Sequence, residues 1–458
     1  MHRLLFFSLI LQFFGCQPPE SSISSLDISD NGRYFVTENE TPFFWLGDTG
    51  WLIFSRLNRE EANIYLDDRK AKGFNVIQAM VIHDVFASNF YGDSALIKGN
   101  VALPDTTDGV DFSDTLAYDF WDHIDYVIDL AQQKGLYMAL VPVWGSNVKS
   151  GKVQVGQASK YAKWLSKRYA NQPHIIWLNG GDTRGDQNTH IWNEIGRQLK
   201  INNPNHLITF HPFGRTQSSM WFHDADWLDF NMFQSGHRRY DQDDTELAYG
   251  EDSWKYVRND YSLIPTKPTL DGEPSYEGIP QGLHDTSQPY WSDSDLRRYA
   301  YWSVFEGACG FTYGHSAIMQ MHKPNNPKPA YGVRQTWEEA LNAPGAQQMI
   351  WLKELMTSYS FHELNPDNAL VISNGQRYNY QPSLIGKEVA LTYTYNGREI
   401  SIDFNKLRFS SFTASWYNPR NGQKTQIDLY NGDTPTAFDP PGNQANGNDW
   451  ILVLENSN

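Results

Sequence analysis

The hydrophobic positions of the chain follow two periods over residues 43–315. Short apolar runs, typical of buried strands, alternate with longer segments whose apolar residues recur every three or four positions, as on one face of a helix. The expected strands are 43–48, 75–80, 135–143, 174–182, 207–211, 228–232, 268–273 and 310–313. The expected helices are 59–72, 118–134, 157–169, 191–200, 246–259, 293–305 and, leading out of the last strand, 347–359. This alternation predicts an α/β fold, a (β/α)8 TIM barrel.

Two segments stand outside the alternation. Residues 26–42 predict a small hairpin, because Asn31-Gly32 is a favoured two-residue turn. Residues 83–116 are rich in Asp, Gly and Thr and show no period. Irregular inserts of this length are usually functional loops or lids.

Beyond residue 360 the pattern changes to short alternating runs. These runs are 369–372, 389–395, 400–404, 412–417 and 450–454, with Asn-Gly turns between several of them. We therefore expect a barrel over residues 26–359 and a C-terminal antiparallel β-sandwich domain over residues 360–458.

The N-terminus has the pattern of a targeting segment. A basic start precedes the apolar run Leu4–Phe14, which is too short for a standard membrane span. Gly15-Cys16 follows, so residues 1–15 resemble a bacterial lipoprotein signal peptide with Cys16 as the lipidated residue, although Phe13 stands where Leu is usual. Residues 16–25 then form a tether, and the protein is expected in the bacterial cell envelope, on either membrane face. The alternative is an ordinary secretory signal that contains a cysteine.

Composition narrows the class of partner. A net charge of −16 over 458 residues argues against nucleic acid, and leaves the lipid anchor as the only membrane contact. Trp, Tyr and Phe number 16, 25 and 25, and such rings suit the apolar faces of sugars. Cys309, the only cysteine besides Cys16, is expected to be a small buried residue. No spacing of Cys and His suggests a metal and no fingerprint suggests a cofactor, so we expect neither.

Two of the expected strands end in an acidic residue beside glycine. One runs into Asp271-Gly-Glu273-Pro and the other into Asn179-Gly-Gly-Asp182. In a TIM barrel the chemistry lies at the carboxyl ends of the strands, where these acids would meet. Two facing carboxyl groups are what most glycoside hydrolases use.

Several motifs together resemble one family. They are Phe44-Trp-Leu-Gly-Asp-Thr-Gly-Trp51, Trp177-Leu-Asn-Gly-Gly-Asp182, Asp271-Gly-Glu-Pro274, Ala300-Tyr-Trp-Ser303 and Gly307–His315, with Ser415–Arg420 and Asn448–Val453 in the tail. Over residues 26–455 the chain resembles the apiosidase-like glycoside hydrolases, whose barrel is followed by a β domain often labelled a putative collagen-binding domain of a collagenase. The resemblance implies a retaining, exo-acting enzyme that releases apiose from rhamnogalacturonan-II side chains of plant pectin.

On this resemblance Glu273 is expected to be the nucleophile and Asp182 the acid/base. Alternatively, Asp182 caps a helix and Glu273 is the structural partner of an Arg. Glu277 is the main alternative to Glu273 as nucleophile, whereas Glu306 is expected to be structural. The expected substrate-binding residues are Asp48, Gln78, Trp144, His211, Gln234, His237 and His315.

Two other classes of function were weighed. A non-catalytic, glycan-binding lipoprotein would carry a degenerate barrel, but both strand-end acids are present. Collagen cleavage has no support, since the chain lacks a His-Glu-x-x-His zinc motif.

Overall fold

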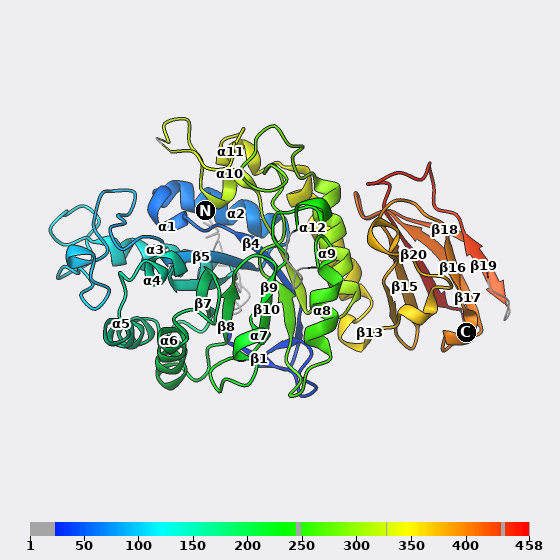
Figure 1. Ribbon diagram of the computed structural model, residues 1–458, viewed down its shortest axis with the longest axis horizontal. Coiled ribbons are helices and arrows are strands. Elements are labelled where there is room, and N and C mark those ends of the chain that lie inside the picture. The colour runs from blue at the N-terminus through cyan, green and yellow to red at the C-terminus, as the bar shows by residue number, and fades with distance from the viewer. Residues whose placement is uncertain (1–22, 244–248, 327, 432–435, 458) are drawn as a thin grey trace, which may run out of the picture.

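The computed structural model describes residues 23–457 except 244–248, 327 and 432–435, so the signal segment and Cys16 lie outside the described residues. Its largest sheet has nine strands in the order β8-β7-β6-β5-β4-β12-β11-β10-β9 (Figure 1). All neighbouring strands in this order are parallel except the last pair, in which β9 (Thr216–Gln217) is antiparallel to β10. The parallel strands are β4 (Trp45–Thr49), β5 (Val76–Ile82), β6 (Tyr137–Val143), β7 (Ile175–Thr183), β8 (Ile208–Pro212), β10 (Asn231–Gln234), β11 (Thr269–Asp271) and β12 (Gly310–Tyr313).

Contacts across β8 and β10 close this sheet into a barrel. The backbone N–H of Asp229 donates to Ile208 O at 2.8 Å, and Thr209 Oγ1 donates to Phe230 O at 2.6 Å. The fold class predicted from the sequence is therefore confirmed: a (β/α)8 barrel.

Helices follow the strands and cover the barrel. They are α1 (Ile53–Arg56), α2 (Arg59–Ala71), α3 (Phe120–Gln133), α4 (Gly145–Lys149), α5 (Val155–Arg168), α6 (Thr189–Asn202), α7 (Ser219–Phe222), α8 (Ser253–Tyr261), α9 (Asp293–Phe305), α10 (Ser316–Met319), α11 (Trp337–Ala340) and α12 (Pro344–Ser358). No helix of the described part is long and apolar enough to cross a bilayer.

A three-stranded sheet, β1 (Leu26–Ile28), β2 (Phe35–Thr37) and β3 (Pro42–Phe43), closes the amino-terminal end of the barrel. Phe35 packs edge-on against Phe230 and beside Trp45, both of which begin or precede barrel strands. Cys309 belongs to the same apolar cluster and is buried, as expected. The predicted hairpin is thus a plug, and it leaves the carboxyl end of the barrel open for a site.

The C-terminal domain is built on an antiparallel sheet in the order β13-β14-β15-β20-β17-β18, with β16 and β19 as a separate pair. The strands are β13 (Asn365–Pro366), β14 (Ser383–Ile385), β15 (Val389–Thr394), β16 (Ile400–Ile402), β17 (Ser411–Tyr417), β18 (Lys424–Asn431), β19 (Thr436–Phe438) and β20 (Trp450–Asn456). Side chains alternate along β15 and β20: Leu391 and Val453 pack toward the barrel helices, and Ala390 and Leu454 toward the β16–β19 pair. One face of the sheet is therefore part of the barrel's outer core.

Two sequence-based expectations need correction here. Residues 369–372 do not form a strand; residues 368–370 make a 3-10 turn, capped by Asp367. The helix expected from residue 246 begins at Ser253. The insert over 83–116 is irregular as predicted, apart from one short 3-10 turn, Ile97–Gly99.

Candidate active site

The turn that follows β11 carries Glu273, and three bonds fix its shape. Asp271 is fully buried and accepts from the Ser235 hydroxyl at 2.6 Å and from the Glu273 backbone N–H at 3.3 Å. Gln78 on β5 donates its amide to Gly272 O at 2.7 Å. Burial raises the pKa of Asp271 to about 7. These residues hold the turn and leave the Glu273 side chain facing the barrel mouth.

The Glu273 carboxylate is surrounded by donors. Tyr276 donates its hydroxyl to Oε1 at 2.7 Å, His237 Nε2 lies 3.5 Å from Oε1, and His211 Nε2 lies 3.1 Å from Oε2. Trp51 donates in turn to the Tyr276 hydroxyl at 2.8 Å. Burial alone would raise the pKa of Glu273, but the two imidazoles outweigh it and lower that pKa to about 2. Glu273 is therefore ionised across the working range of most enzymes.

Asp182 reaches the same mouth through a bulge near the end of β7. Gly180, Gly181 and Asp182 have φ of +99°, +97° and +48°, and the β7–β8 register shifts between Gly180 and Thr183. Bulges of this kind redirect a side chain. A Cβ on Gly181 would lie 2.5 Å from the Trp144 ring, so only glycine fits there. The bulge supplies the repositioned backbone that a short acid requires.

His211 joins the two acidic residues. The backbone N–H of Asp182 donates to His211 Nδ1 at 3.3 Å, while Nε2 of the same ring faces Glu273. Because Nδ1 accepts, a neutral His211 carries its proton on Nε2, where it points to the carboxylate. A single imidazole ring thus separates the backbone of Asp182 from the Glu273 carboxylate.

The pKa of Asp182 is shifted in the opposite direction. Its side chain is accessible to solvent, yet surrounding protein hinders hydration of its charge, as on the wall of a hollow. This desolvation and the negative charge of Glu273 raise its pKa to about 6, against the lowering effects of His211, His237 and the Gly214 backbone. One carboxyl group of the pair is held ionised and the other is easily protonated.

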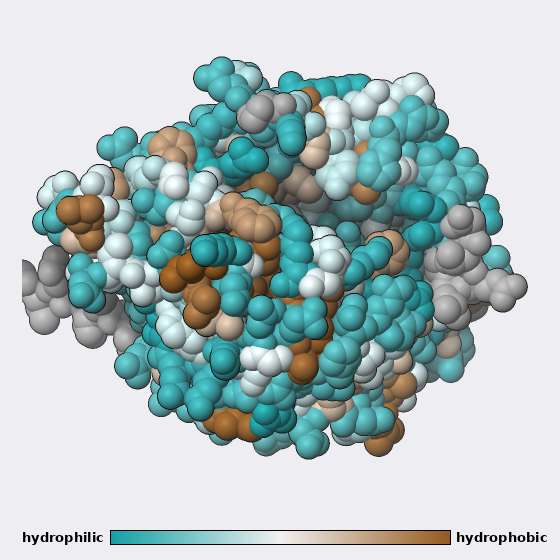
Figure 2. Space-filling model, turned by 60° about the vertical axis from the view of Figure 1, so that its left-hand side comes forward, coloured by the Kyte–Doolittle hydropathy of each residue, from teal (hydrophilic) through white to brown (hydrophobic). Residues whose placement is uncertain are grey.

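Aromatic rings pack together around His211, beside the two carboxyl groups. Trp51, Trp144 and His211 are mutual neighbours, with ring centroids 5.3 to 5.6 Å apart. Trp144 is partly exposed, as a residue that meets a sugar must be. Figure 2 brings forward the side of Figure 1 on which the β5–α3 segment projects, and there hydrophobic residues reach the surface beside a hollow.

Four of the expected substrate-binding residues are buried. Asp48 is fully buried, 3.1 Å from Arg69 Nε, and accepts from the Tyr65 hydroxyl. Gln78 supports the Gly272 turn, and Gln234 is buried at 3% exposure. His315 is buried and caps α10 through Nδ1, and burial lowers its pKa to about 3. Asp48, Gln78 and His315 are thus engaged by protein partners, and sugar contact by these three and by Gln234 stays a prediction.

The rival acidic residues are structural. Glu277 is buried and accepts from the Tyr313 hydroxyl at 2.6 Å and from the Gly345 N–H at 3.0 Å, where α12 begins. Glu306 accepts hydrogen bonds from Tyr380 and Asn368 of the C-terminal domain, as its structural reading anticipated. Neither side chain contacts Asp182 or Glu273.

Three site residues were not singled out from the sequence. Trp51 ends a motif that marked the family, and Tyr276 lies three positions after Glu273, so both carried a weak signal. No sequence pattern singled out Tyr331. It comes from the segment between α10 and α11, has a φ of +55°, and interacts electrostatically with both Asp182 and Glu273, which together with burial raise its pKa. A bulky residue in the left-handed region is uncommon and often marks a functional site.

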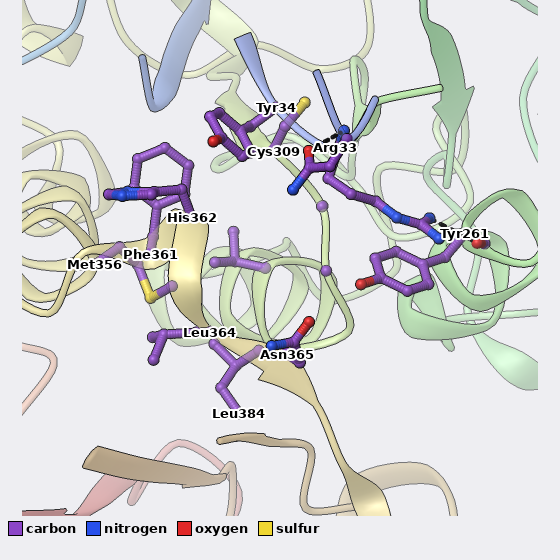
Figure 3. A pocket seen from close by; sticks show the side chains of 14 residues that line it. Arg33, Tyr34, Tyr261, Cys309, Met356, Phe361, His362, Leu364, Asn365 and Leu384 are labelled. Atoms are coloured by element: carbon purple, nitrogen blue, oxygen red, sulfur yellow. Dashed lines mark hydrogen bonds between the residues drawn. The ribbon is translucent and has the colours of Figure 1, made fainter. Parts of the chain in front are cut away.

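A cavity of about 50 Å³ at the other end of the barrel has a different character (Figure 3). It lies between the amino-terminal plug, the start of β12 and the C-terminal domain, and its lining includes Tyr34, Cys309 and Leu384. Arg33 crosses its edge to donate to Tyr261 O at 2.7 Å. A space of this size holds water rather than a sugar, so it is a packing gap where three parts of the chain meet. Within the described residues, no cluster of His, Cys, Asp and Glu is arranged to hold a metal ion.

Comparison with known proteins agrees with this geometry. Residues 29–363 match the family described as "Apiosidase-like, catalytic domain", and residues 365–455 match "Putative collagen-binding domain of a collagenase". A solved structure titled "Glycoside hydrolase" is 43% identical with a TM-score of 0.88, over 96% of this chain and 98% of that one. A glycoside hydrolase family 5 structure from Bacteroides vulgatus ATCC 8482 is 41% identical with a TM-score of 0.88, over 94% and 93%. No curated protein matches the chain. With its barrel, its facing carboxyl groups and a family match that spans most of its length, the chain belongs to the apiosidase-like glycoside hydrolases.

Proposed function

We propose that this glycoside hydrolase retains anomeric configuration, with Glu273 as nucleophile and Asp182 as acid/base. The observation that carries the proposal is the opposite pKa shift of two carboxyl groups, about 2 for Glu273 and about 6 for Asp182, with His211 between the Asp182 backbone and the Glu273 carboxylate. Paired groups whose environments separate their pKa values are the usual mark of divided acid and nucleophile roles.

The reaction then runs in two displacements. Glu273 attacks the anomeric carbon, the glycosidic C–O bond breaks, and the departing oxygen takes the proton of Asp182. In the second step Asp182 removes a proton from water, the water oxygen attacks the same carbon, and Glu273 leaves as a carboxylate.

The neighbouring side chains fit these steps. The Nε2–H of His211 and the hydroxyl of Tyr276 hold Glu273 in a fixed orientation for attack. Once Glu273 is esterified its charge is gone, and that charge is one of the two causes that raise the pKa of Asp182. The pKa of Asp182 therefore falls in the glycosyl-enzyme, when the residue must act as a base.

Glu273→Ala tests the nucleophile. We expect loss of nearly all turnover, and recovery with added azide that yields a glycosyl azide of inverted configuration, because azide occupies the space of the missing carboxylate. Near wild-type turnover by Glu273→Ala would refute the assignment. Asp182→Ala should slow substrates with poor leaving groups far more than activated aryl glycosides, and equal losses would remove Asp182 from the acid role.

For the substrate we propose plant pectin, with exo-acting release of apiose from rhamnogalacturonan-II side chains. The support is the family match over residues 29–363 and the barrel motifs that carry the resemblance. Incubation of the purified protein with separated pectin fractions, followed by identification of the released monosaccharides, tests it. Release of apiose from rhamnogalacturonan-II alone is the expected result, and release of another sugar would replace this substrate while leaving the glycosidase intact.

For the location we propose lipid anchoring to the bacterial cell envelope through Cys16. The support is the order of basic start, apolar run and Gly15-Cys16. Cys16→Ser should move the protein from the membrane fraction to the soluble fraction of its host. An unchanged distribution would favour the ordinary secretory signal.

A further inference from the structure

The segment between β5 and α3 exposes more apolar surface than its surroundings. Its exposed apolar residues are Phe86, Phe90, Tyr91, Ile97, Leu103, Val110, Phe112 and Leu116. Scattered exposed apolar residues are ordinary, but a concentration on one segment marks a binding surface. The segment follows the carboxyl end of β5, at the catalytic end of the barrel.

Phe86 has the most exposed aromatic ring of this group, and that ring is held in place. It is 72% exposed. One edge of its ring rests on Gly99, where a Cβ would lie 2.6 Å from Cε1. The Lys152 ammonium lies 5.6 Å from the ring centroid and is paired with Asp84 at 2.9 Å. An exposed ring held by a glycine backbone and flanked by an ion pair is ordered before any ligand arrives.

Short contacts anchor the segment of Phe86 beside Trp144. The Asn147 amide donates to Trp144 O at 3.1 Å and to His83 O at 3.0 Å, and its oxygen accepts from Val85 N at 3.2 Å. The chain therefore leads from Trp144, through Asn147, directly to the residue before Phe86. The backbone that carries Phe86 is therefore anchored to the segment that carries Trp144, at the catalytic end of the barrel.

We propose that Phe86 stacks on a sugar residue next to the one that is cleaved, so that the enzyme recognises a carbohydrate chain rather than a single sugar. This inference deepens the proposed function and rests on it. The C–H face of a pyranose or furanose ring covers the exposed phenyl face, while Asp84 and Lys152 are placed to bind its hydroxyl groups. Each of these flanking side chains is about two-fifths exposed, at 43% and 38%, and so is open to a ligand.

A protein partner is the other candidate occupant, and the structure favours sugar. A stable protein interface covers on the order of 800 Å² on each side. Phe86 with its one flanking ion pair, on a segment anchored beside Trp144, matches one sugar residue of a chain. If a sugar binds here, Phe86→Ala weakens polysaccharide binding; if a protein binds here, it leaves polysaccharide binding unchanged.

The test uses binding, so that it does not depend on turnover. In the full chain carrying Glu273→Gln, the Kd for rhamnogalacturonan-II polysaccharide is measured by calorimetry with and without Phe86→Ala. The loss of one aromatic contact, roughly 0.5–1.5 kcal/mol, should raise this Kd about three- to tenfold and leave the Kd for free apiose unchanged. Phe86→Trp should keep wild-type binding.

The matched control is Ile201→Ala, which removes an apolar side chain that is 62% exposed near the end of α6, at the opposite end of the barrel. It should leave both Kd values unchanged. Equal polysaccharide binding with and without Phe86→Ala, at unchanged melting temperature, overturns the inference, even if the wild-type enzyme hydrolyses the polysaccharide. Absence of any hydrolysis by the wild type would instead count against the proposed function.

Discussion

At the scale of residues, the environment of each carboxyl group decides its role. Asp182 and Glu273 both end barrel strands, but imidazoles surround Glu273 whereas Asp182 faces the charge of Glu273. His211 is common to both environments, since it accepts from the Asp182 backbone and lies against the Glu273 carboxylate. The two pKa values separate because His211 and His237 stabilise the Glu273 carboxylate, whereas burial and the charge of Glu273 raise the pKa of Asp182.

Tyr331 provides a test at the same scale. Burial and the charges of Asp182 and Glu273 raise its pKa, and we propose that the hydroxyl lies close enough to these groups to bind the substrate. Tyr331→Phe keeps the ring and removes one hydrogen bond, and a loss of roughly 1.5 kcal/mol should lower kcat/KM about tenfold. Tyr359→Phe is the control, because its hydroxyl bonds Glu455, far from the site. Steady-state kinetics with an aryl glycoside measures both, and equal rates for the two variants would exclude Tyr331 from the site.

Sequence patterns singled out Asp182 and Glu273, but they did not predict which other polar residues at strand ends would be bound by protein partners. A period-two strand in a barrel sends alternate residues into the interior or into the layer under the helices, and the pattern does not say which polar residues find partners there. Asp48 is taken by Arg69 of α2 and His315 by the N-terminus of α10. Arg69 is brought to Asp48 by tertiary packing, which no local period records, whereas His315 acts as a local cap two residues before Ala317. Tyr331 escaped prediction for the same reason as the pair of Asp48 and Arg69.

At the scale of elements, the bulge near the end of β7 places the acid. The two glycines in Asn179-Gly-Gly-Asp182 suggested an altered backbone, and the structure has it in consecutive left-handed residues. Strand ends were predictable because apolar runs are local, whereas the three-residue strands β14 and β19 and the eight-residue strand β18 were missed. β18 is an edge strand with mostly exposed side chains, so its apolar signal is weak.

Gly181→Ala tests the bulge. Its φ of +97° disfavours a side chain, and the new Cβ would meet Trp144, so the backbone that carries Asp182 must shift. We expect a loss of at least a hundredfold in kcat/KM, on the order of 3 kcal/mol, since small displacements of a catalytic group are costly. Gly151→Ala has a φ of +75° with nothing within 4 Å of the new Cβ, and controls for backbone strain alone. Similar rate losses in the two variants would contradict the role of the bulge.

At the scale of the whole molecule, the C-terminal domain is fixed to the barrel through α9. Arg297 donates to both oxygens of Asp449, at 2.7 and 2.9 Å, and both side chains are buried. Arg298, the next residue, pairs with Glu251 at 2.6 Å and lies among the rings of Tyr378 and Tyr395. The sheet face that a free binding module would present to a ligand is covered here by α9 and α12. This domain is therefore a structural part of the enzyme.

Asp449→Ala tests whether the barrel and the C-terminal domain stabilise each other. It leaves the buried Arg297 with only Asp293 and Gln348 as side-chain partners, and breaking a buried pair costs about 3–5 kcal/mol. Lys424→Ala removes an exposed pair with Glu455 and should cost less than about 1 kcal/mol. Urea unfolding measures both free energies. Equal values, or a barrel transition unaffected by Asp449→Ala, would show that the domains are energetically independent.

The most direct test of the divided roles of Asp182 and Glu273 is the pH dependence of kcat/KM for a substrate with a poor leaving group, which needs the acid. Glu273 must be ionised, so the rate should fall only as pH drops toward about 2, and Asp182 must be protonated, so it should fall as pH rises through about 6. Asp182→Asn should abolish the limb near 6 while leaving a low, flat residual rate. If the limb near 6 persists in Asp182→Asn, another group supplies the proton and the assignment of the pair is wrong.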